Sequence, residues 1–296
     1  MRHSTDVRTA GCAALRRMTH ARASASDDNR GMSAGSRQEW PGGAPFAASI
    51  TFDFDAEEVW LGEDPANANR PGVLSQGTYA PKVAIPLLLD LLDRHGVPAT
   101  FYVPGGDAER HGDRVREILA AGHEVGHHGY THRSPTALTR AEEESELTRG
   151  LEILRGLGAD VVGYRSPSWD FSPHTLELLG AHGFEYSSNL MDDIRPYRHP
   201  GGVVEVPVSW LLDDAPHFWF AGDTWNKTIR TVGEVYALWK DELDGIASLG
   251  AHYMLTMHPQ FIGRPSRLAL LDRVLSDITA MGGWIAPTRD VARLVP

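Results

Sequence analysis

Apolar residues follow two alternating patterns along most of the chain, beginning near Pro45. Short apolar runs predict strands, and longer stretches with an apolar residue every three or four positions predict helices. Residues 82–95 show the second pattern clearly, because Leu88 and Leu92 recur on one face and Gly96 follows as a stop signal. Strands that alternate with helices in this way indicate a parallel sheet covered by helices.

The alternation continues to the end of the chain. Predicted strands cover 46–54, 99–103, 123–126, 161–164, 184–187, 203–208, 253–257 and 284–286, and predicted helices cover 82–95, 113–121, 141–157, 175–182, 232–248 and 267–281. About seven strand–helix repeats in roughly 250 residues fit a closed or nearly closed (β/α) barrel. We therefore predict an α/β fold with a single domain over residues 44–296.

The first 43 residues lack this pattern. They mix Arg, Ser, Ala, Gly and Asp without sustained apolar periodicity, so we predict a disordered extension over residues 1–43. Met32 is a second candidate for the start of translation. A transit peptide is the alternative, because residues 1–22 are rich in Arg and contain one acidic residue, Asp6.

Composition and charge exclude several classes of function. The formal net charge of -11 and the pI of about 5.7 argue against a nucleic-acid partner, which would require a concentrated Lys/Arg surface. The single cysteine, Cys12, excludes a disulfide framework and a thiolate metal site, so any metal must be held by His and carboxylate. No apolar run reaches the roughly 20 residues needed to span a bilayer, and no apolar leader is visible. We therefore expect a cytoplasmic protein without a membrane partner.

Two carboxylates end the first predicted strand. Asp53 and Asp55 are two positions apart, so their side chains point to the same side of the strand. Two acids that share a site repel each other unless a cation or an unequal proton distribution separates their roles, as for one metal ligand and one base. The alternative is a pair of turn residues that cap a loop.

Four histidines lie within residues 123–132, directly after another predicted strand. His128 and His132 are four apart, a spacing that brings two imidazoles to one side of a helical or tight turn, where neutral nitrogens bind a cation. Histidines on a polar turn are more often solvated surface groups. The two aspartates at the end of the first strand favour the metal site over that alternative.

Two further candidates, Arg165 and His258, follow predicted strands. The carboxyl ends of the strands are where (β/α) barrels place their chemistry. An Arg in this position can orient a carboxylate, and a His can donate a proton to a leaving amine. The structural alternatives are a salt bridge for Arg165 and a buried core histidine for His258.

These segments together resemble a known family. The motifs at 51–55, 128–132, 165–169 and 257–259 occur in the order found in the polysaccharide deacetylases, carbohydrate esterase family 4. Residues 91–103 also look like that family's second strand and the helix before it. The resemblance covers roughly residues 45–296, and the motifs are specific in combination although each is weak alone.

The resemblance implies a deformed (β/α)7-type barrel that binds a divalent metal, usually zinc. The metal ligands of the family correspond to Asp55, His128 and His132. The earlier acid, Asp53, corresponds to the general base, Arg165 to the residue that orients this base, and His258 to the general acid. Such a site hydrolyses an amide, because a Lewis-acidic metal polarises the carbonyl and activates water.

One departure leaves the substrate open. Phe54 separates the two acids, and Ala56 and Glu57 follow where Gly-Pro is usual. This form, together with residues 186–193 and 258–267, is similar to a subgroup of peptidoglycan-deacetylase-like proteins whose relatives hydrolyse allantoin and cyclic imides. The substrate is therefore either an N-acetylated sugar or peptidoglycan-like carbohydrate, or a small cyclic amide or ureide cleaved with or without a metal. A silent carbohydrate-binding relative is disfavoured, because all the expected ligands are present.

The aromatic residues give two candidates for substrate binding, Trp169 in the 165–169 motif and Trp210 in the aromatic stretch 210–225. Aromatic faces stack on sugar rings, but a cluster of this kind is more often a core or a subunit interface. Members of the subgroup are often oligomers with enclosed sites. We therefore expect a homo-oligomer.

Overall fold

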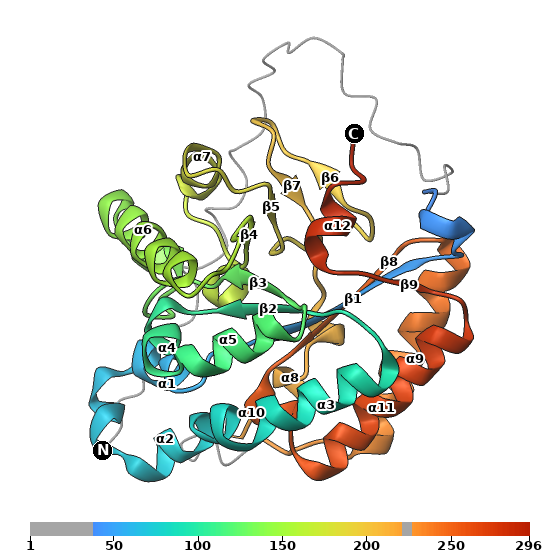
Figure 1. The fold of residues 1–296 in the computed structure, drawn as a ribbon, viewed down its shortest axis with the longest axis horizontal. Coiled ribbons are helices and arrows are strands. Elements are labelled where there is room, and N and C mark those ends of the chain that lie inside the picture. The colour runs from blue at the N-terminus through green and yellow to red at the C-terminus, as the bar shows by residue number, and fades with distance from the viewer. Residues whose placement is uncertain (1–37, 221–226) are drawn as a thin grey trace, which may run out of the picture. The chain divides into compact units, whose positions relative to one another are not determined.

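The computed structural model describes residues 38–220 and 227–296. Its centre is a nine-stranded sheet, which curls around the middle of the molecule in Figure 1. The strands are β1 (Ala47–Asp53), β2 (Thr100–Val103), β3 (Glu124–His127), β4 (Gly163–Tyr164), β5 (Tyr186–Ser187), β6 (Tyr197–Arg198), β7 (Val204–Glu205), β8 (His252–Met257) and β9 (Trp284–Ile285).

The strand order is that of a barrel with one irregular seam. The order is β6-β7-β5-β4-β3-β2-β1-β8, and β9 pairs with β1. All pairs are parallel except β6 with β7. Asp213, which follows β7, forms an isolated parallel bridge with Thr256 on β8. This bridge brings the two ends of the strand order together without a regular ladder. The deformed (β/α) barrel predicted from the sequence is therefore confirmed.

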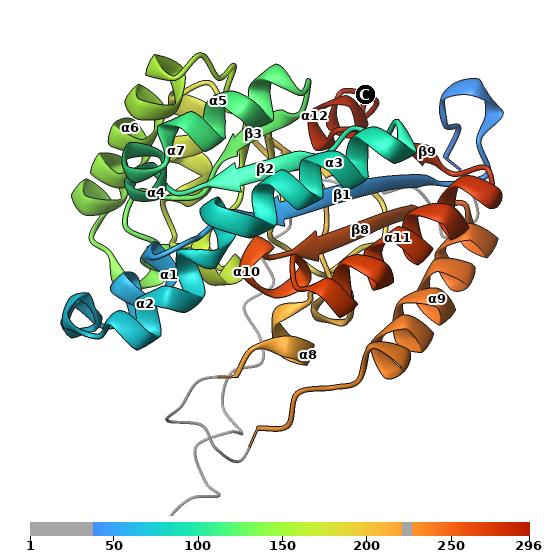
Figure 2. The same ribbon diagram turned by 60° about the horizontal axis from the view of Figure 1, so that its bottom comes forward.

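Helices connect the strands and cover the outside of the sheet (Figure 2). They are α1 (Glu58–Glu63), α2 (Pro71–Gly77), α3 (Ile85–His95), α4 (Gly105–Arg110), α5 (Gly112–Ala120), α6 (Arg140–Gly156), α7 (Thr175–Ala181), α8 (Ala215–Phe218), α9 (Val232–Leu249), α10 (Pro259–Ile262), α11 (Pro265–Ala280) and α12 (Thr288–Ala292). α5 and α6 pack on β3, and α9 packs on β8. Among the described residues, none of these helices is long and apolar enough to cross a bilayer.

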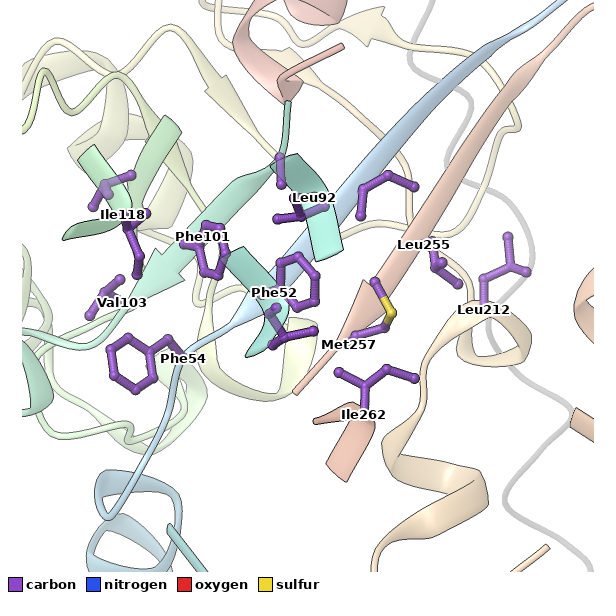
Figure 3. Close-up of a cluster of buried hydrophobic side chains, with 14 of the residues drawn as sticks. Phe52, Phe54, Leu92, Phe101, Val103, Ile118, Leu212, Leu255, Met257 and Ile262 are labelled. Carbon is purple, nitrogen blue, oxygen red and sulfur yellow. The ribbon is translucent and has the colours of Figure 1, made fainter. Parts of the chain in front are cut away.

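The alternation of side chains along β1 separates the core from the site. Ile50, Phe52 and Phe54 belong to the hydrophobic core between the sheet and the helices, where Phe52 stacks on Phe101 with ring centroids 4.7 Å apart (Figure 3). The intervening Thr51 and Asp53 contact a buried arginine instead. Because successive strand residues point to opposite faces, one buried strand both anchors the core and carries polar groups inward.

The described chain begins before the domain boundary predicted at residue 44. Trp40 is buried, and its Nε1 donates a hydrogen bond to the carbonyl oxygen of Gly250 at 3.1 Å. Its ring also lies 6.3 Å from that of Trp284. The folded domain therefore includes residues 38–43, which the sequence analysis placed in the extension because one tryptophan makes no periodic pattern. Residues 1–37 lie outside the described residues.

Candidate active site

A cavity of about 410 Å³ opens at the carboxyl ends of the strands. The candidate residues that line it are Asp55, His128, His132, His258, Trp169 and Trp210. They follow β1, β3, β4, β8 and the segment after β7, so sequence-distant loops meet at one end of the barrel. This is the end at which (β/α) barrels place their chemistry.

Three histidines surround the Asp55 carboxylate. Its Oδ1 lies 3.3 Å from Nε2 of His128 and 3.7 Å from Nε2 of His132, and its Oδ2 lies 3.6 Å from Nε2 of His258. Burial by itself raises the pKa of Asp55, but the charges of these histidines and the contact with His128 lower it to about 2. The carboxylate is therefore ionised at neutral pH.

The turn after β3 fixes the two imidazoles. His128 Nδ1 donates a hydrogen bond of 2.7 Å to the carbonyl oxygen of Arg165, which leaves the lone pair of Nε2 free to face Asp55. Gly129 and His132 both have positive φ, 73° and 53°, so the chain reverses tightly between the two histidines. A partner on the far nitrogen sets the tautomer of a metal-binding histidine, and His128 has such a partner.

The cluster fits a divalent cation. Asp55 is buried, yet neither of its carboxylate oxygens has a hydrogen-bond partner among the described residues. Buried carboxylates are costly unless they are paired or coordinate a metal. One ligand atom from each of Asp55, His128 and His132 lies within 4.8 Å of the others. Two nitrogens and one oxygen form the donor set of an open catalytic zinc site.

A second buried pair lies beside this cluster. Arg165 Nη1 donates hydrogen bonds to Asp53 Oδ1 at 2.8 Å and to Thr51 Oγ1 at 2.9 Å. Its other amino group donates to Ser188 Oγ at 2.9 Å, and its guanidinium lies 4.1 Å from the centre of the Tyr102 ring. Arg165 is completely buried, so these contacts hold one oxygen of Asp53 in a fixed position.

The third part of the site is His258, which is held by the carboxylate of Asp214. The sequence analysis gave Asp214 no function. Nδ1 of His258 donates a hydrogen bond of 2.7 Å to Asp214 Oδ1, and its backbone N–H donates to the same oxygen at 3.0 Å. Burial alone lowers the pKa of His258, but the charge of Asp213 and the hydrogen bond to Asp214 raise it well above its ordinary value. His258 is therefore cationic at neutral pH.

Asp213 and Asp214 could have been found from one signal. They directly follow the apolar stretch 203–212, which leads out of a predicted strand, as Asp53 and Asp55 do. Both carboxylates are buried, and the bridge from Asp213 to Thr256 brings them to the end of β8 beside His258.

Two tryptophans form an aromatic wall of the cavity. The rings of Trp169 and Trp210 stack with centroids 4.4 Å apart, Trp169 buried and Trp210 48% exposed. Ser168 and Trp169 both have positive φ, 63° and 55°, a strained backbone conformation that non-glycine residues rarely adopt. Of the other two tryptophans of the predicted aromatic stretch, Trp219 also lines the cavity, and Trp225 lies outside the described residues.

Comparison with known proteins identifies the family. The polysaccharide deacetylase family model matches residues 78–187. The peptidoglycan deacetylase of Helicobacter pylori is 32% identical over 266 residues, which cover 79% of this chain and 90% of that protein. The chain therefore belongs to the polysaccharide deacetylase family. Its enzyme class, a hydrolase of carbon–nitrogen bonds other than peptide bonds, agrees with the class predicted from the sequence.

The chain is similar to solved structures of two proteins described as polysaccharide deacetylases and of one allantoinase. A candidate polysaccharide deacetylase from Mycobacterium smegmatis is 41% identical and superposes with a TM-score of 0.85 over 88% of this chain and 93% of its own. A Pseudomonas aeruginosa protein described in the same way is 26% identical, with a TM-score of 0.75 over 86% and 92% of the two chains. An allantoinase is 25% identical, with a TM-score of 0.73 over the same shares.

Proposed function

We propose that the protein is a zinc-dependent deacetylase that releases acetate from an N-acetylated sugar or a peptidoglycan-like substrate. The observation that carries this proposal is the buried Asp55 carboxylate, which lies among three imidazoles and has no hydrogen-bond partner in the described part of the chain. The relative from Helicobacter pylori, a peptidoglycan deacetylase, supports this choice of substrate. So does a chitooligosaccharide deacetylase from Rhizobium leguminosarum, 45% identical over 138 residues that cover 40% of this chain and 61% of that protein.

Asp55, His128 and His132 would hold the metal. A divalent cation in this position polarises an amide carbonyl and lowers the pKa of water. The protein's part is to hold these two imidazoles and an ionised carboxylate close together. The hydrogen bond from His128 Nδ1 to the Arg165 carbonyl oxygen keeps the proton of that ring away from the metal side.

Asp53 is the proposed general base. Its Oδ1 is held by Arg165 at 2.8 Å, while its Oδ2 lies 3.9 Å from Nε2 of His128 and so faces the metal ligands. The free oxygen accepts a proton from the attacking water. Since Arg165 fixes the carboxylate in advance, little reorganisation is needed during the reaction.

His258 is the proposed general acid. Asp214 holds Nδ1, so Nε2 is the nitrogen that faces Asp55 and the reacting centre. In its cationic form the ring gives a proton to the leaving amine, and the products are acetate and the free amino sugar. Trp169 and Trp210 are the proposed stacking surface for the sugar ring, because aromatic faces cover the apolar faces of sugars.

The second candidate function is hydrolysis of a small cyclic amide or ureide. Two observations favour it, the likeness to an allantoinase and the size of the cavity, about 410 Å³. The same residues could open a cyclic amide, because water attack and protonation of the leaving nitrogen are common to both reactions.

A substrate screen separates the two. We expect acetate release from chitooligosaccharides or muropeptides, increased by added zinc and abolished by a chelator. Ring opening of allantoin or succinimide without acetate release from any sugar would contradict the deacetylase and favour the second candidate.

We also propose that the protein is a homo-oligomer, as the subgroup resemblance predicts. The exposed apolar side chains of Met191, Ile194 and Leu249 are available for a subunit contact. Light scattering should give a mass of at least two chains. A monomeric mass at high micromolar concentration would contradict this proposal.

A further inference from the structure

The cavity contains one cation that the proposed mechanism does not use. Among the described residues that line the cavity, Arg133 is the only Lys or Arg. It directly follows His132, so its backbone position is fixed by the turn that carries a proposed metal ligand. Its side chain is 43% exposed, and the residue lines the cavity.

Among the described residues, Arg133 has one distant counter-ion, Glu142. Its Nη1 lies 3.9 Å from Glu142 Oε1. Glu142 is already engaged in the capping box of α6, where its Oε2 accepts hydrogen bonds of 2.8 Å from both the backbone N–H and the hydroxyl of Thr139. By contrast, Arg140 has a similar exposure of 45% but forms ion pairs of 3.1 and 2.9 Å with Glu144 and Glu177. The guanidinium of Arg133 is thus free to take a further acceptor.

The charges around the cavity determine which acceptor fits. Asp53, Asp55, Asp213 and Asp214 are buried close to the reacting centre, where they face the proposed metal and the cationic His258. Arg133 is then the cation of the described lining that is left for an anionic substituent. An arginine binds a carboxylate with two parallel hydrogen bonds, which adds orientation as well as affinity.

We propose that Arg133 selects substrates that carry a carboxylate close to the scissile amide. The inference rests on the proposed deacetylase activity. His132 and Arg133 line one cavity of about 410 Å³, so the amide at the metal ligands and the carboxylate at Arg133 belong to a single small unit. An N-acetylated sugar with an acidic ether substituent on the neighbouring carbon has this chemistry, whereas a neutral N-acetylhexosamine does not.

The test uses three matched probes, N-acetylmuramic acid, its methyl ester and N-acetylglucosamine. For the wild-type protein we expect kcat/KM for acetate release to be about tenfold higher with the acid than with the ester, the size of a partly exposed charge-assisted hydrogen bond. Arg133→Gln should remove this preference and leave the ester and the neutral sugar unchanged. Arg133→Lys should retain part of it, and the control Arg140→Gln should retain all of it.

Binding of the acid and the ester, measured by calorimetry, keeps this inference separate from the proposed function. If no probe releases acetate but the acid binds more tightly than the ester in an Arg133-dependent way, the deacetylase proposal fails and the carboxylate site stands. A wild-type protein that shows no preference for the acid, or an Arg133→Gln variant that weakens all three probes equally, would overturn the inference.

Discussion

Hydrogen-bond partners, more than residue type, separate the buried carboxylates of the site into different roles. Asp53 is held by an arginine, and Asp214 accepts two hydrogen bonds from His258. Within residues 38–220 and 227–296, Asp55 has no hydrogen-bond partner. A carboxylate with one oxygen held, like Asp53, can accept a proton on its other oxygen. A carboxylate bonded to an imidazole, like Asp214, stabilises the positive charge of that ring. A carboxylate without a partner, like Asp55, is available to bind a cation. The sequence shows all three as aspartates and cannot show this difference.

The first prediction concerns the pair His258 and Asp214. A general acid must be protonated, so activity should be lost as pH rises through the pKa of His258, which its carboxylate partners raise. Asp214→Asn removes a negative charge at 2.7 Å, which lowers that pKa. The alkaline limb of the pH–rate profile should therefore move to lower pH, by about one unit or more.

The matched control is Asp192→Asn. Asp192 is exposed, it does not line the cavity, and its carboxylate accepts a hydrogen bond from the Tyr197 hydroxyl. An alkaline limb at the same pH in Asp214→Asn and in the wild-type protein would show that His258 is not the titrating acid.

The elements that the sequence predicted are those with a repeated pattern. The strands that became β1, β2 and β8 and the helices that became α3, α6, α9 and α11 were predicted within a few residues of their observed ends. The short helices α1, α2, α4, α8, α10 and α12 were not predicted, because a helix of one or two turns offers too few positions for periodicity. They belong to the connections after the strands, and tertiary contacts stabilise them.

The sequence likewise predicted part of the site and missed another part. The six residues predicted to be catalytic or to bind metal, Asp53, Asp55, His128, His132, Arg165 and His258, are brought together around one cavity, and their individual roles stay predictions. Each lies at or after the end of a strand, so the barrel rule was enough to group them. Asp214 was missed because its contact with His258 joins segments about forty residues apart, which no local sequence pattern shows.

The second prediction concerns the start of the folded domain. A chain that begins at Gln38 should be as stable as the full chain, because residues 1–37 offer no periodic apolar surface. A chain that begins at Gly42 loses Trp40 and its hydrogen bond to Gly250, which should cost about 3–5 kcal/mol of unfolding free energy, as for a buried tryptophan removed from a core. Urea unfolding of both chains measures this, and equal stability would contradict the role of Trp40.

At the scale of the whole molecule, two buried histidines predict loss of stability in acid. Burial lowers the pKa of His127 and of His252 to about 3. In the unfolded chain both titrate near 6.5, so between about pH 6.5 and 3 the unfolded state binds protons that the folded state does not. Stability should therefore fall as pH decreases, by about 1.4 kcal/mol per pH unit for each histidine.

His252→Gln should reduce this slope by about 1.4 kcal/mol per pH unit, the contribution of one proton, because the variant lacks the buried ring that must stay neutral. The readout is the pH dependence of the unfolding free energy, and it does not depend on any overall loss of stability. His174→Gln, a change at a partly exposed position, is the control. An unchanged slope in His252→Gln would show that this histidine does not resist protonation in the folded state.

We propose different roles for two acids that lie two residues apart, Asp55 as a metal ligand and Asp53 as a general base. The most direct test is zinc content by elemental analysis together with turnover on the best substrate of the screen, for the wild-type protein, Asp55→Ala and Asp53→Asn. Asp55→Ala should lose both metal and activity. Asp53→Asn should keep its zinc while turnover falls by roughly two to four orders of magnitude, the usual effect of a lost general base. A wild-type protein that is active without metal, or equal loss of zinc in the two variants, would contradict the account.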